Sequence, residues 1–192
     1  EDKVSLNHVC LAMLKQEESV AVELLKKYHV PFDAVKTKLS EDKQLILELN
    51  SMHELTNYNE LVNKQKRVMV GRDEELQQLL QTLCKKEKNN ALIIGKAGVG
   101  KTALIEKLAL QINEHKVPEQ LQNKVIFELN LSSIVAGTKY RGEFEEKFKK
   151  IIQKVIQAKD VILFIDEMHN LIGAGGAEGA IDASNILKPY LA

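Results

Sequence analysis

The strongest constraint in this chain is the run Gly95-Lys96-Ala97-Gly98-Val99-Gly100-Lys101-Thr102, which fits the pattern G-x-x-x-x-G-K-[ST]. In that pattern a glycine-rich loop joins a strand to a helix, and its backbone N–H groups surround phosphate oxygens. The context agrees with the pattern, because an apolar run at residues 91–94 predicts the strand and apolar residues at helical spacing predict a helix over residues 102–113. The run therefore predicts a phosphate-binding loop in preference to an ordinary glycine-rich turn.

The residue types in this loop suit the chemistry of a nucleotide. Glycine lets the backbone approach the phosphates closely. Lys101 supplies a positive charge for the β- and γ-phosphates, and the hydroxyl of Thr102 can bind Mg²⁺. We therefore expect nucleotide contacts from every residue of the loop and from the residue after it: Gly95, Lys96, Ala97, Gly98, Val99, Gly100, Lys101, Thr102 and Ala103.

Two carboxylates follow a second apolar run. Residues 161–165 are apolar, as in a strand buried on both faces of a parallel sheet, and Asp166 and Glu167 come directly after them. Ligands of such sheets bind at the carboxyl ends of the strands. We predict that Asp166 holds Mg²⁺ together with Thr102, and that Glu167 activates the attacking water as a general base. Lys101 and Glu167 are the candidate catalytic residues.

The order of the predicted elements indicates an α/β fold. A β-rich run at residues 125–131 follows the first helix, and a helical stripe at residues 144–158 leads to the second apolar strand. Alternation of strand and helix implies right-handed crossovers and a parallel sheet flanked by helices. We expect three segments: short helices in residues 1–39, one of them capped by Ser19, a polar connector at residues 40–67, and the α/β domain at residues 68–192.

Charge and composition exclude several classes of protein. The 27 Lys and Arg residues balance the 27 Asp and Glu residues, so the chain lacks the positive field of a dedicated nucleic-acid binder. No apolar run approaches the ~20 residues that cross a bilayer, and no export signal is found. The two cysteines form no disulfide framework. We expect an aqueous interior compartment, with no nucleic-acid partner and no membrane.

Residues 137–144 place an aromatic side chain between two cations, because Tyr140 lies between Lys139 and Arg141 and is followed by Gly142. An exposed turn before the next helix explains this composition. A mobile loop in which the amphipathic Tyr140 grips another molecule also explains it. The residues alone leave both interpretations open.

Several stretches together resemble the first AAA+ module of the Clp ATPases, which are ring-forming, ATP-driven protein unfoldases and disaggregases. They are VGRDEE from Val70, the phosphate-binding loop, GTKYRGEFEEK from Gly137, VILFIDE from Val161 and GAGGAEGAIDASNILKP from Gly173. The last stretch is most similar to the ClpC branch. A weaker similarity, from Ser5 onward, relates residues 1–39 to a helical repeat of the family's N-terminal domain. The resemblance implies a P-loop NTPase fold of the AAA+ type, preceded by a small partial helical domain.

The same resemblance implies roles for individual residues. Val70 and Gly71 match positions that lie against adenine, and Glu167 matches the residue that activates water. The substrate-gripping pore loop of the family matches Lys139, Tyr140, Arg141 and Gly142. Lys96 and Ala97 stand where the family usually has Glu and Pro, but both are variable positions of the motif, so nucleotide binding is expected to survive.

The resemblance also implies cofactors, partners and location. ATP and Mg²⁺ are the expected cofactors, and unfolded or tagged proteins the expected substrates, with adaptor proteins and a peptidase as further partners. A homo-hexamer is expected for the full-length protein, in the cytoplasm or in a plastid stroma. The family's sensor-1 strand, arginine finger and small helical subdomain are not in the sequence, so we expect this piece alone to be inactive.

Two alternatives use the same nucleotide core. Asp166-Glu167-Met168-His169 fits the D-E-x-H box of a helicase, so a helicase or a clamp-loader-like nucleic-acid ATPase is one alternative. The zero net charge weighs against it. The other alternative is a nucleotide-binding adaptor or scaffold without turnover, which would require Lys101 or Glu167 to be misplaced.

Overall fold

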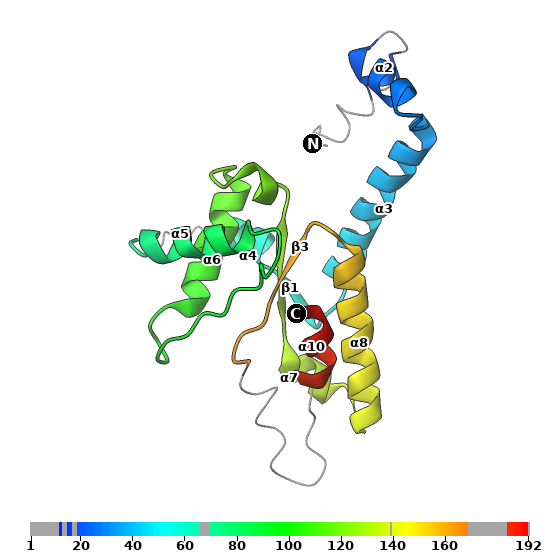
Figure 1. Ribbon diagram of the computed structural model, residues 1–192. Helices are drawn as coiled ribbons and strands as arrows, with labels where there is room; N and C mark the ends of the chain where they lie inside the picture. The colour runs from blue at the N-terminus through cyan, green and yellow to red at the C-terminus, as the bar shows by residue number, and fades with distance from the viewer. Residues whose placement is uncertain are drawn as a thin grey trace. The chain divides into compact units, whose positions relative to one another are not determined.

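The computed structural model describes residue 12 and residues 15–16, 19–65, 70–138, 140–168 and 184–191. The chain divides into two compact units, Glu1–Glu48 and Leu49–Ala192 (Figure 1). Of the short helices predicted in residues 1–39, any part before residue 19 lies outside the described residues, apart from residues 12 and 15–16. The boundary between the units falls inside one helix, α3 (Phe32–Asn50).

The described part of the first unit is helical, as predicted. Ser19 caps α2 (Val20–Lys27), and its side-chain oxygen accepts a hydrogen bond from the N–H of Val22 at 3.3 Å. This confirms the predicted N-cap. The helix ends at Lys27, with Tyr28 as its C-cap, and α3 begins directly after Pro31. Proline disfavours helix in the residue before it, so Pro31 keeps the two helices separate. Among the described residues, no helix is both long and apolar enough to cross a membrane.

The sheet of the second unit is mixed. Its strands are β1 (Leu55–Asn57), β2 (Val125–Leu129) and β3 (Val161–Phe164), in the order β1-β2-β3. The predicted strands at 125–131 and 161–165 are confirmed in slightly shorter form, and they pair in parallel. The sequence did not predict β1, which pairs with β2 in antiparallel register. The α/β class is confirmed, but the sheet carries an antiparallel edge strand.

The predicted strand at residues 91–94 is wrong for this structure. The segment joins no described strand, and Leu92 and Ile94 are 72% and 86% exposed. Ile93 alone packs against the hydrophobic core. An apolar run predicts burial, whereas a strand also needs a neighbour whose backbone groups complete the ladder.

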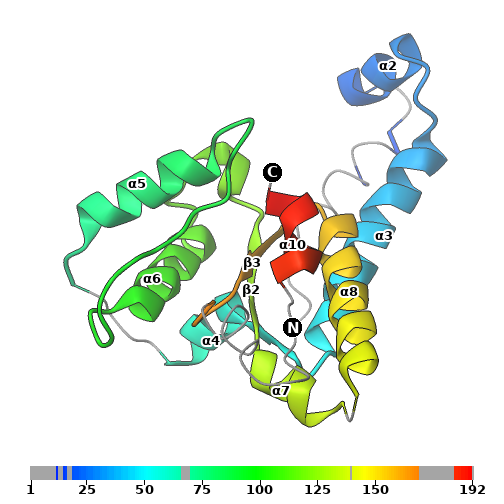
Figure 2. The ribbon, with the colours of Figure 1, turned by 60° about the horizontal axis from the view of Figure 1, so that its bottom comes forward.

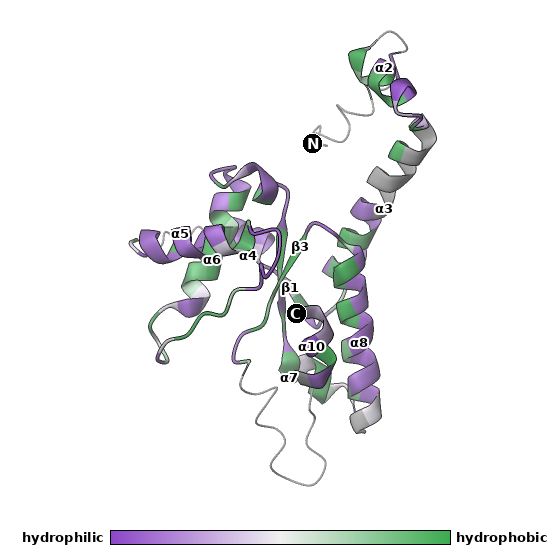
Figure 3. Ribbon diagram, in the orientation of Figure 1, coloured by the Kyte–Doolittle hydropathy of each residue, from purple (hydrophilic) through white to green (hydrophobic). Residues whose placement is uncertain are grey.

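Helices cover both faces of the sheet, so that the second unit has three layers (Figures 1 and 2). One layer contains α4 (Tyr58–Gln65), α5 (Asp73–Leu83) and α6 (Lys101–Asn113). The other contains α7 (Leu131–Ala136), α8 (Arg141–Gln157) and α10 (Ser184–Leu191), and a short 3₁₀ helix at Glu119–Leu121 precedes β2. β3 is hydrophobic, whereas α5 and α8 carry hydrophilic residues on their outer sides (Figure 3).

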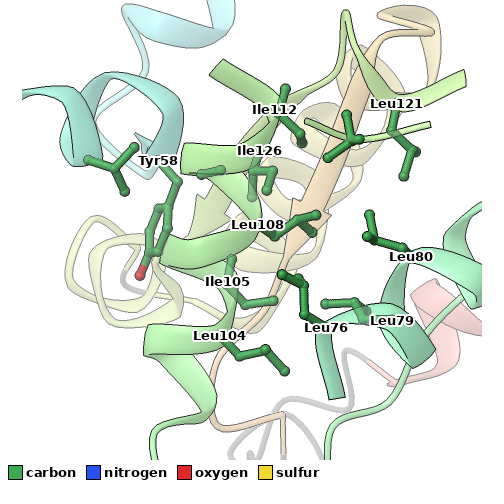
Figure 4. Close-up of a cluster of buried hydrophobic side chains, with 13 residues drawn as sticks. Tyr58, Leu76, Leu79, Leu80, Leu104, Ile105, Leu108, Ile112, Leu121 and Ile126 are labelled. Carbon is green, nitrogen blue, oxygen red and sulfur yellow. The ribbon is translucent and has the colours of Figure 1, made fainter. Parts of the chain in front are cut away.

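Alternation along β2 divides the core between the two faces. Ile126 belongs to the cluster beneath α4, α5 and α6, so its neighbour Phe127 points to the opposite face, where Phe144 and Phe148 of α8 are also buried. Figure 4 shows the first cluster. Its labelled side chains are Tyr58, Leu76, Leu79, Leu80, Leu104, Ile105, Leu108, Ile112, Leu121 and Ile126.

Residues 49–65 of the predicted connector at residues 40–67 belong to the second unit in the structure. Leu49, Leu55, Tyr58 and Val62 are all buried there. The polar composition of this segment concealed its role, because several of its polar side chains make structural hydrogen bonds. Asn59 is the main example: its Oδ1 accepts from the N–H of Ile126 at 2.8 Å, and its Nδ2 donates to Asn113 Oδ1 at 2.9 Å.

We predict that Asn59→Ala lowers the free energy of unfolding by about 1–3 kcal/mol, because the N–H of buried Ile126 loses its partner. Asn123→Ala, a change at an exposed position on the turn before β2, is the control and should cost less than ~0.5 kcal/mol. Urea unfolding of both variants measures the difference. Equal stability of the two variants would show that residues 58–65 do not support β2.

Glu54 is a buried acid beside the start of β1, with 3% of its side chain exposed. Its Oε1 lies 2.6 Å from Lys147 Nζ and 3.2 Å from His53 Nε2. Burial acts to raise the pKa of Glu54, but the hydrogen bonds to the carboxylate and the charges of Lys147 and His53 outweigh it. The pKa of Glu54 therefore lies below its ordinary value of 4.5.

A carboxyl group whose pKa is lowered by folding stabilises the fold at pH values above its unfolded-state pKa. That contribution is lost as the pH falls through the folded-state pKa. We predict that Glu54→Gln lowers the free energy of unfolding by about 1–3 kcal/mol at neutral pH. The difference from wild type should shrink as the pH falls below 4.5. Urea unfolding at intervals from neutral to acidic pH tests this. A deficit that does not change with pH would contradict the ionic origin.

Candidate nucleotide site

The phosphate-binding loop has the backbone that its glycines allow. Gly98 and Gly100 have φ angles of +77° and +91°, which favour glycine strongly. A Cβ added at Gly98 would meet nothing within 4 Å, so the space over the loop is open. The open space and the left-handed glycines together leave room for phosphate groups close to the backbone.

The N-terminus of α6 has the features of an anion-binding site. Its N-cap, Gly100, supplies no side-chain cap, and no acidic residue stands in the first turn. The first N–H groups of a helix have no partner within the helix, and the helix dipole adds positive potential there. This arrangement fits a bound phosphate.

Lys101 lies over the loop that precedes it. Its Nζ donates hydrogen bonds to the carbonyl oxygens of Gly95 at 3.1 Å and Lys96 at 3.0 Å. The Lys101 ammonium is therefore held by two exposed backbone acceptors of the same loop. Phosphate oxygens, which carry a negative charge, would compete for the ammonium with an advantage over these neutral carbonyls.

Asp166 and Thr102 meet across 64 positions of sequence, and the Thr102 hydroxyl donates to Asp166 Oδ2 at 2.9 Å. The packing of β3 explains this contact, since Ile162 and Phe164 both pack on the α6 side of the sheet and Asp166 follows with the same period of two. The other carboxylate oxygen accepts from the N–H of Glu167 at 2.8 Å. The structure thus brings together the two predicted ligands of Mg²⁺.

Thr102 and Asp166 match the usual way in which proteins bind Mg²⁺, which rarely takes all of its ligands from the protein. Among the described residues, no three His, Cys, Asp or Glu side chains gather as a metal site. Mg²⁺ usually takes one or two protein oxygens and completes its shell with phosphate oxygens and water. The hydroxyl of Thr102 and the carboxylate of Asp166 are oxygen donors of that kind.

Glu167 occupies the turn after β3 and is exposed. Its φ of +50° is unusual for a residue with a side chain. His169, which the helicase alternative uses, lies outside the described residues. So do residues 173–183 of the glycine-rich stretch that begins at Gly173, and Lys139 of the predicted pore loop.

Arg72 connects the segment of Val70 and Gly71 to the phosphate-binding loop, a role that no sequence pattern predicted. Its guanidinium donates to the carbonyl oxygen of Val99 at 2.9 Å and to Glu75 Oε1 at 2.7 Å. The Glu75 contact lowers the pKa of that carboxyl. Val70 itself is 89% exposed. The spacing between Arg72 and the loop gives no sequence signal for this contact.

Lys107 makes a second connection to this segment. Its Nζ donates to the carbonyl oxygen of Gly71 and to Asp73 Oδ1, the latter at 2.7 Å. Lys107 belongs to α6, whose first residues form the end of the loop. The segment at residues 70–73 is therefore attached both to the loop and to the helix that follows it.

Glu128 adds a second carboxylate near Asp166. It is not among the site residues predicted from the sequence. It shares a face of β2 with Ile126 and is hydrogen-bonded to Tyr58. Burial is the main cause that raises the pKa of Glu128, and the charge of Asp166 adds to the effect. The ring of Tyr58 packs edge-on against Phe164, with centroids 5.8 Å apart. The sequence did contain a sign of this role, because Glu128 is an acid within an otherwise apolar strand at residues 125–129.

Tyr140 belongs to a different part of the unit, between α7 and α8. It is the N-cap residue of α8 and is 72% exposed, and its carbonyl oxygen accepts from the N–H of Glu143 at 3.1 Å. Arg141 and Gly142 form the first residues of that helix. The aromatic side chain is presented to solvent at the end of a long helix.

Residues 91–191 match the ATPase family associated with various cellular activities (AAA). The chain belongs to this AAA family. The match begins at the segment before the phosphate-binding loop and includes both acids, and it confirms the P-loop NTPase fold expected from the sequence.

Similar proteins within this AAA family are Clp-type ATPases, which confirms the resemblance drawn from the sequence. The ATP-binding subunit ClpC of the Clp protease from Staphylococcus epidermidis is 40% identical over 98% of this chain and 25% of the relative. The chaperone protein ClpB of Oceanobacillus iheyensis is 56% identical over 65% of this chain and 15% of the relative. The chain thus spans about a quarter of the length of the first of these relatives.

A solved structure of Hsp104, a protein of S. cerevisiae, has the same fold. In its closed state with ATPγS and FITC casein it matches with a TM-score of 0.63 and 39% identity. The match covers 71% of this chain and 23% of Hsp104.

We predict that Arg72→Gln weakens ADP binding by the full-length protein about fivefold, because one net hydrogen bond to the loop is worth about 1 kcal/mol. Isothermal titration calorimetry with ADP measures the affinity. Lys116→Gln, which removes one positive charge from an exposed pair with Glu114, is the control and should bind ADP as wild type does. An unchanged affinity of Arg72→Gln would mean that the Val99 contact does not shape the nucleotide site.

Proposed function

We propose that this chain is part of an ATP-dependent protein unfoldase in which ATP hydrolysis drives substrate polypeptide through the pore of a ring. The observation that carries the proposal is the hydrogen bond between Thr102 and Asp166, which joins the phosphate-binding loop to the acidic end of β3. Family membership and the similarity to ClpC, ClpB and Hsp104 support it.

The loop residues from Gly95 to Ala103 bind the nucleotide. Lys101 moves its ammonium from the carbonyls of Gly95 and Lys96 to the β- and γ-phosphates, and the free N–H groups at the start of α6 hold the phosphate oxygens. Val70 and Gly71 lie against the adenine, in a segment that Arg72 and Lys107 fix to the loop. Each of these contacts positions the nucleotide before any bond is broken.

Thr102 and Asp166 are the residues that would hold Mg²⁺. A bound Mg²⁺ would neutralise charge on the phosphates. Glu167 accepts a proton from the attacking water as general base, from the turn directly after Asp166. The carboxylate of Glu167 is exposed, which leaves it accessible to water at the γ-phosphate.

Lys139, Tyr140, Arg141 and Gly142 form the substrate-gripping pore loop. Tyr140 suits this role because it presents an exposed aromatic ring at the N-cap of α8, and aromatic side chains give large contact areas without demanding one partner sequence. At its other end α8 leads through Ala158 to the start of β3, and the acids follow the far end of that strand. One helix and one strand thus lie in the chain between the substrate loop and the acids.

The full-length protein acts as a homo-hexamer in the cytoplasm, with a plastid stroma as the alternative location. Its substrates are unfolded or tagged proteins, and adaptor proteins and a partner peptidase assist it. A neighbouring subunit supplies an arginine finger, which is worth about 10³–10⁵-fold in rate in comparable enzymes. The present chain alone is therefore expected to hydrolyse little ATP.

The nucleic-acid alternative has less support. The proteins found to be similar are a protease subunit, a chaperone and Hsp104, and the net charge of the chain is zero. A helicase or clamp loader would show ATP turnover that DNA or RNA stimulates, and binding that weakens steeply with salt.

We predict that Glu167→Gln in the full-length protein lowers ATP turnover by about 10²–10⁴-fold, because the general base is removed. We also predict that Tyr140→Ala lowers the rate of substrate unfolding far more than the rate of ATP turnover. Steady-state phosphate release and loss of fluorescence from a folded fluorescent substrate protein measure the two rates. Glu114→Gln, at an exposed position on the turn after α6, is the control.

Each outcome decides between the hypotheses. Equal turnover by wild type and Glu167→Gln would support the non-hydrolysing scaffold. Unfolding that survives Tyr140→Ala would reject the pore loop. Turnover that depends on added DNA would favour the nucleic-acid ATPase.

A further inference from the structure

The helix α8 carries the exposed Tyr140 at its N-cap and ends close to the start of β3. It has 17 residues, which corresponds to about 25 Å. A straight helix transmits a displacement along its length only if something fixes its position against the rest of the unit. The contacts along the buried side of α8 therefore determine what happens at Tyr140.

Most of that buried side is apolar. Phe144, Phe148 and Ile151 are fully or almost fully buried, and the rings of Phe144 and Phe148 stack with centroids 5.7 Å apart. Apolar contacts are non-directional. Such a face holds α8 against the sheet but fixes its register along the sheet only weakly.

Lys147 interrupts this apolar face. It follows Phe144 by three positions and precedes Ile151 by four, so it lies on the same side of the helix as both. Its side chain is 30% exposed, and its ammonium is 2.6 Å from Glu54 Oε1. A short, charge-assisted hydrogen bond is directional and strong, so this contact fixes α8 at one point two turns after Tyr140.

Glu54 is itself attached to the sheet edge. Its carbonyl oxygen accepts from the N–H of Asn130 at 2.8 Å, and the next residue, Leu55, pairs with Leu129 in the β1–β2 ladder. Asn130 in turn caps α7, since its Oδ1 accepts from the N–H of Ser133 at 3.0 Å. The carboxylate of Glu54 thus holds α8, while its backbone holds the start of α7.

Gly137 leaves the space that the ammonium needs. It ends α7, and a Cβ at this position would come within 3.0 Å of Lys147 Nζ. The backbone of Gly137 has an ordinary φ of −92°, so conformation does not require glycine here. Space for Lys147 is the reason that the structure offers for glycine.

We propose that Glu54 and Lys147 are a pair of positioning residues that anchor the α7–α8 hairpin to the β1 edge, so that movement at the nucleotide site reaches Tyr140 as a defined displacement. The inference rests on the proposed function, because it assigns the anchor of the substrate loop. Neither residue takes part in binding or hydrolysing the nucleotide. Their loss should separate ATP turnover from substrate unfolding.

The test uses the full-length protein and measures ATP turnover and unfolding of a fluorescent substrate protein side by side, at a temperature where every variant remains assembled. The variants are Glu54→Gln, Lys147→Gln, their double variant and Lys147→Arg. Glu114→Gln is the matched control, since it makes the same chemical change in an exposed pair with Lys116. Tyr140→Ala in the same series tests the proposed function itself.

We expect Glu54→Gln and Lys147→Gln each to reduce substrate unfolded per ATP about fivefold while ATP turnover changes less than twofold. The double variant should be no worse than either single change, because the two residues act as one unit. Lys147→Arg should keep most of the coupling, since a guanidinium also binds a carboxylate. If Glu54→Gln does not assemble, Lys147→Gln gives the same test from the partner whose side chain is 30% exposed.

Proportional loss of turnover and unfolding would overturn the inference, because a merely structural pair would act in that way. So would additive effects in the double variant, or a ratio equal to that of Glu114→Gln. If Tyr140→Ala leaves unfolding intact, the pore-loop function fails instead, whatever Glu54→Gln does. The two failures are therefore distinguishable.

Discussion

The hydrogen bond from Thr102 to Asp166 is the contact on which the functional part of the structure depends. It joins the first turn of α6 to the end of β3, two elements that the chain separates by the whole of β2, α7 and α8. It forms because α6 buries Leu104 and Leu108 against the same face of the sheet to which β3 directs Phe164. The packing of the apolar core thus determines the distance between the Thr102 hydroxyl and the Asp166 carboxylate.

The features that could be predicted from sequence were those with local signals. The glycine-rich loop, the helix after it and the acidic end of β3 each have a residue pattern, and the Ser19 cap has one as well. Residues 91–94 show the limit of a pattern, since an apolar run predicts burial but cannot supply the neighbouring strand that a ladder requires. Arg72 shows another limit, because its contact with Val99 depends on tertiary structure alone.

Polar residues that make directed contacts explain why the segment before the nucleotide site resembles a connector in the sequence. Asn59 and Glu54 look like surface residues in the sequence, yet each makes directed contacts with distant elements. Burying such groups without partners would cost about 1–3 kcal/mol each. These hydrogen bonds are directional, whereas apolar contacts are not. The amide of Asn59 therefore fixes the position of β2, and the carboxylate of Glu54 fixes the position of α8.

Residues with positive φ occur both at ordinary helix ends and beside the nucleotide site. Five described non-glycine residues have positive φ: His29, Arg72, Lys88, His115 and Glu167. His29 and His115 follow the ends of α2 and α6, where a left-handed residue commonly terminates a helix. Arg72 and Glu167 instead border the nucleotide site, where such a conformation costs of order 1–3 kcal/mol and persists only if its surroundings enforce it. The bonds from Arg72 to Val99 and from the N–H of Glu167 to Asp166 provide that enforcement. The same contacts that maintain the strained backbone therefore hold residues 70–72 next to the phosphate-binding loop, and hold Glu167 next to the Asp166 carboxylate that accepts from Thr102.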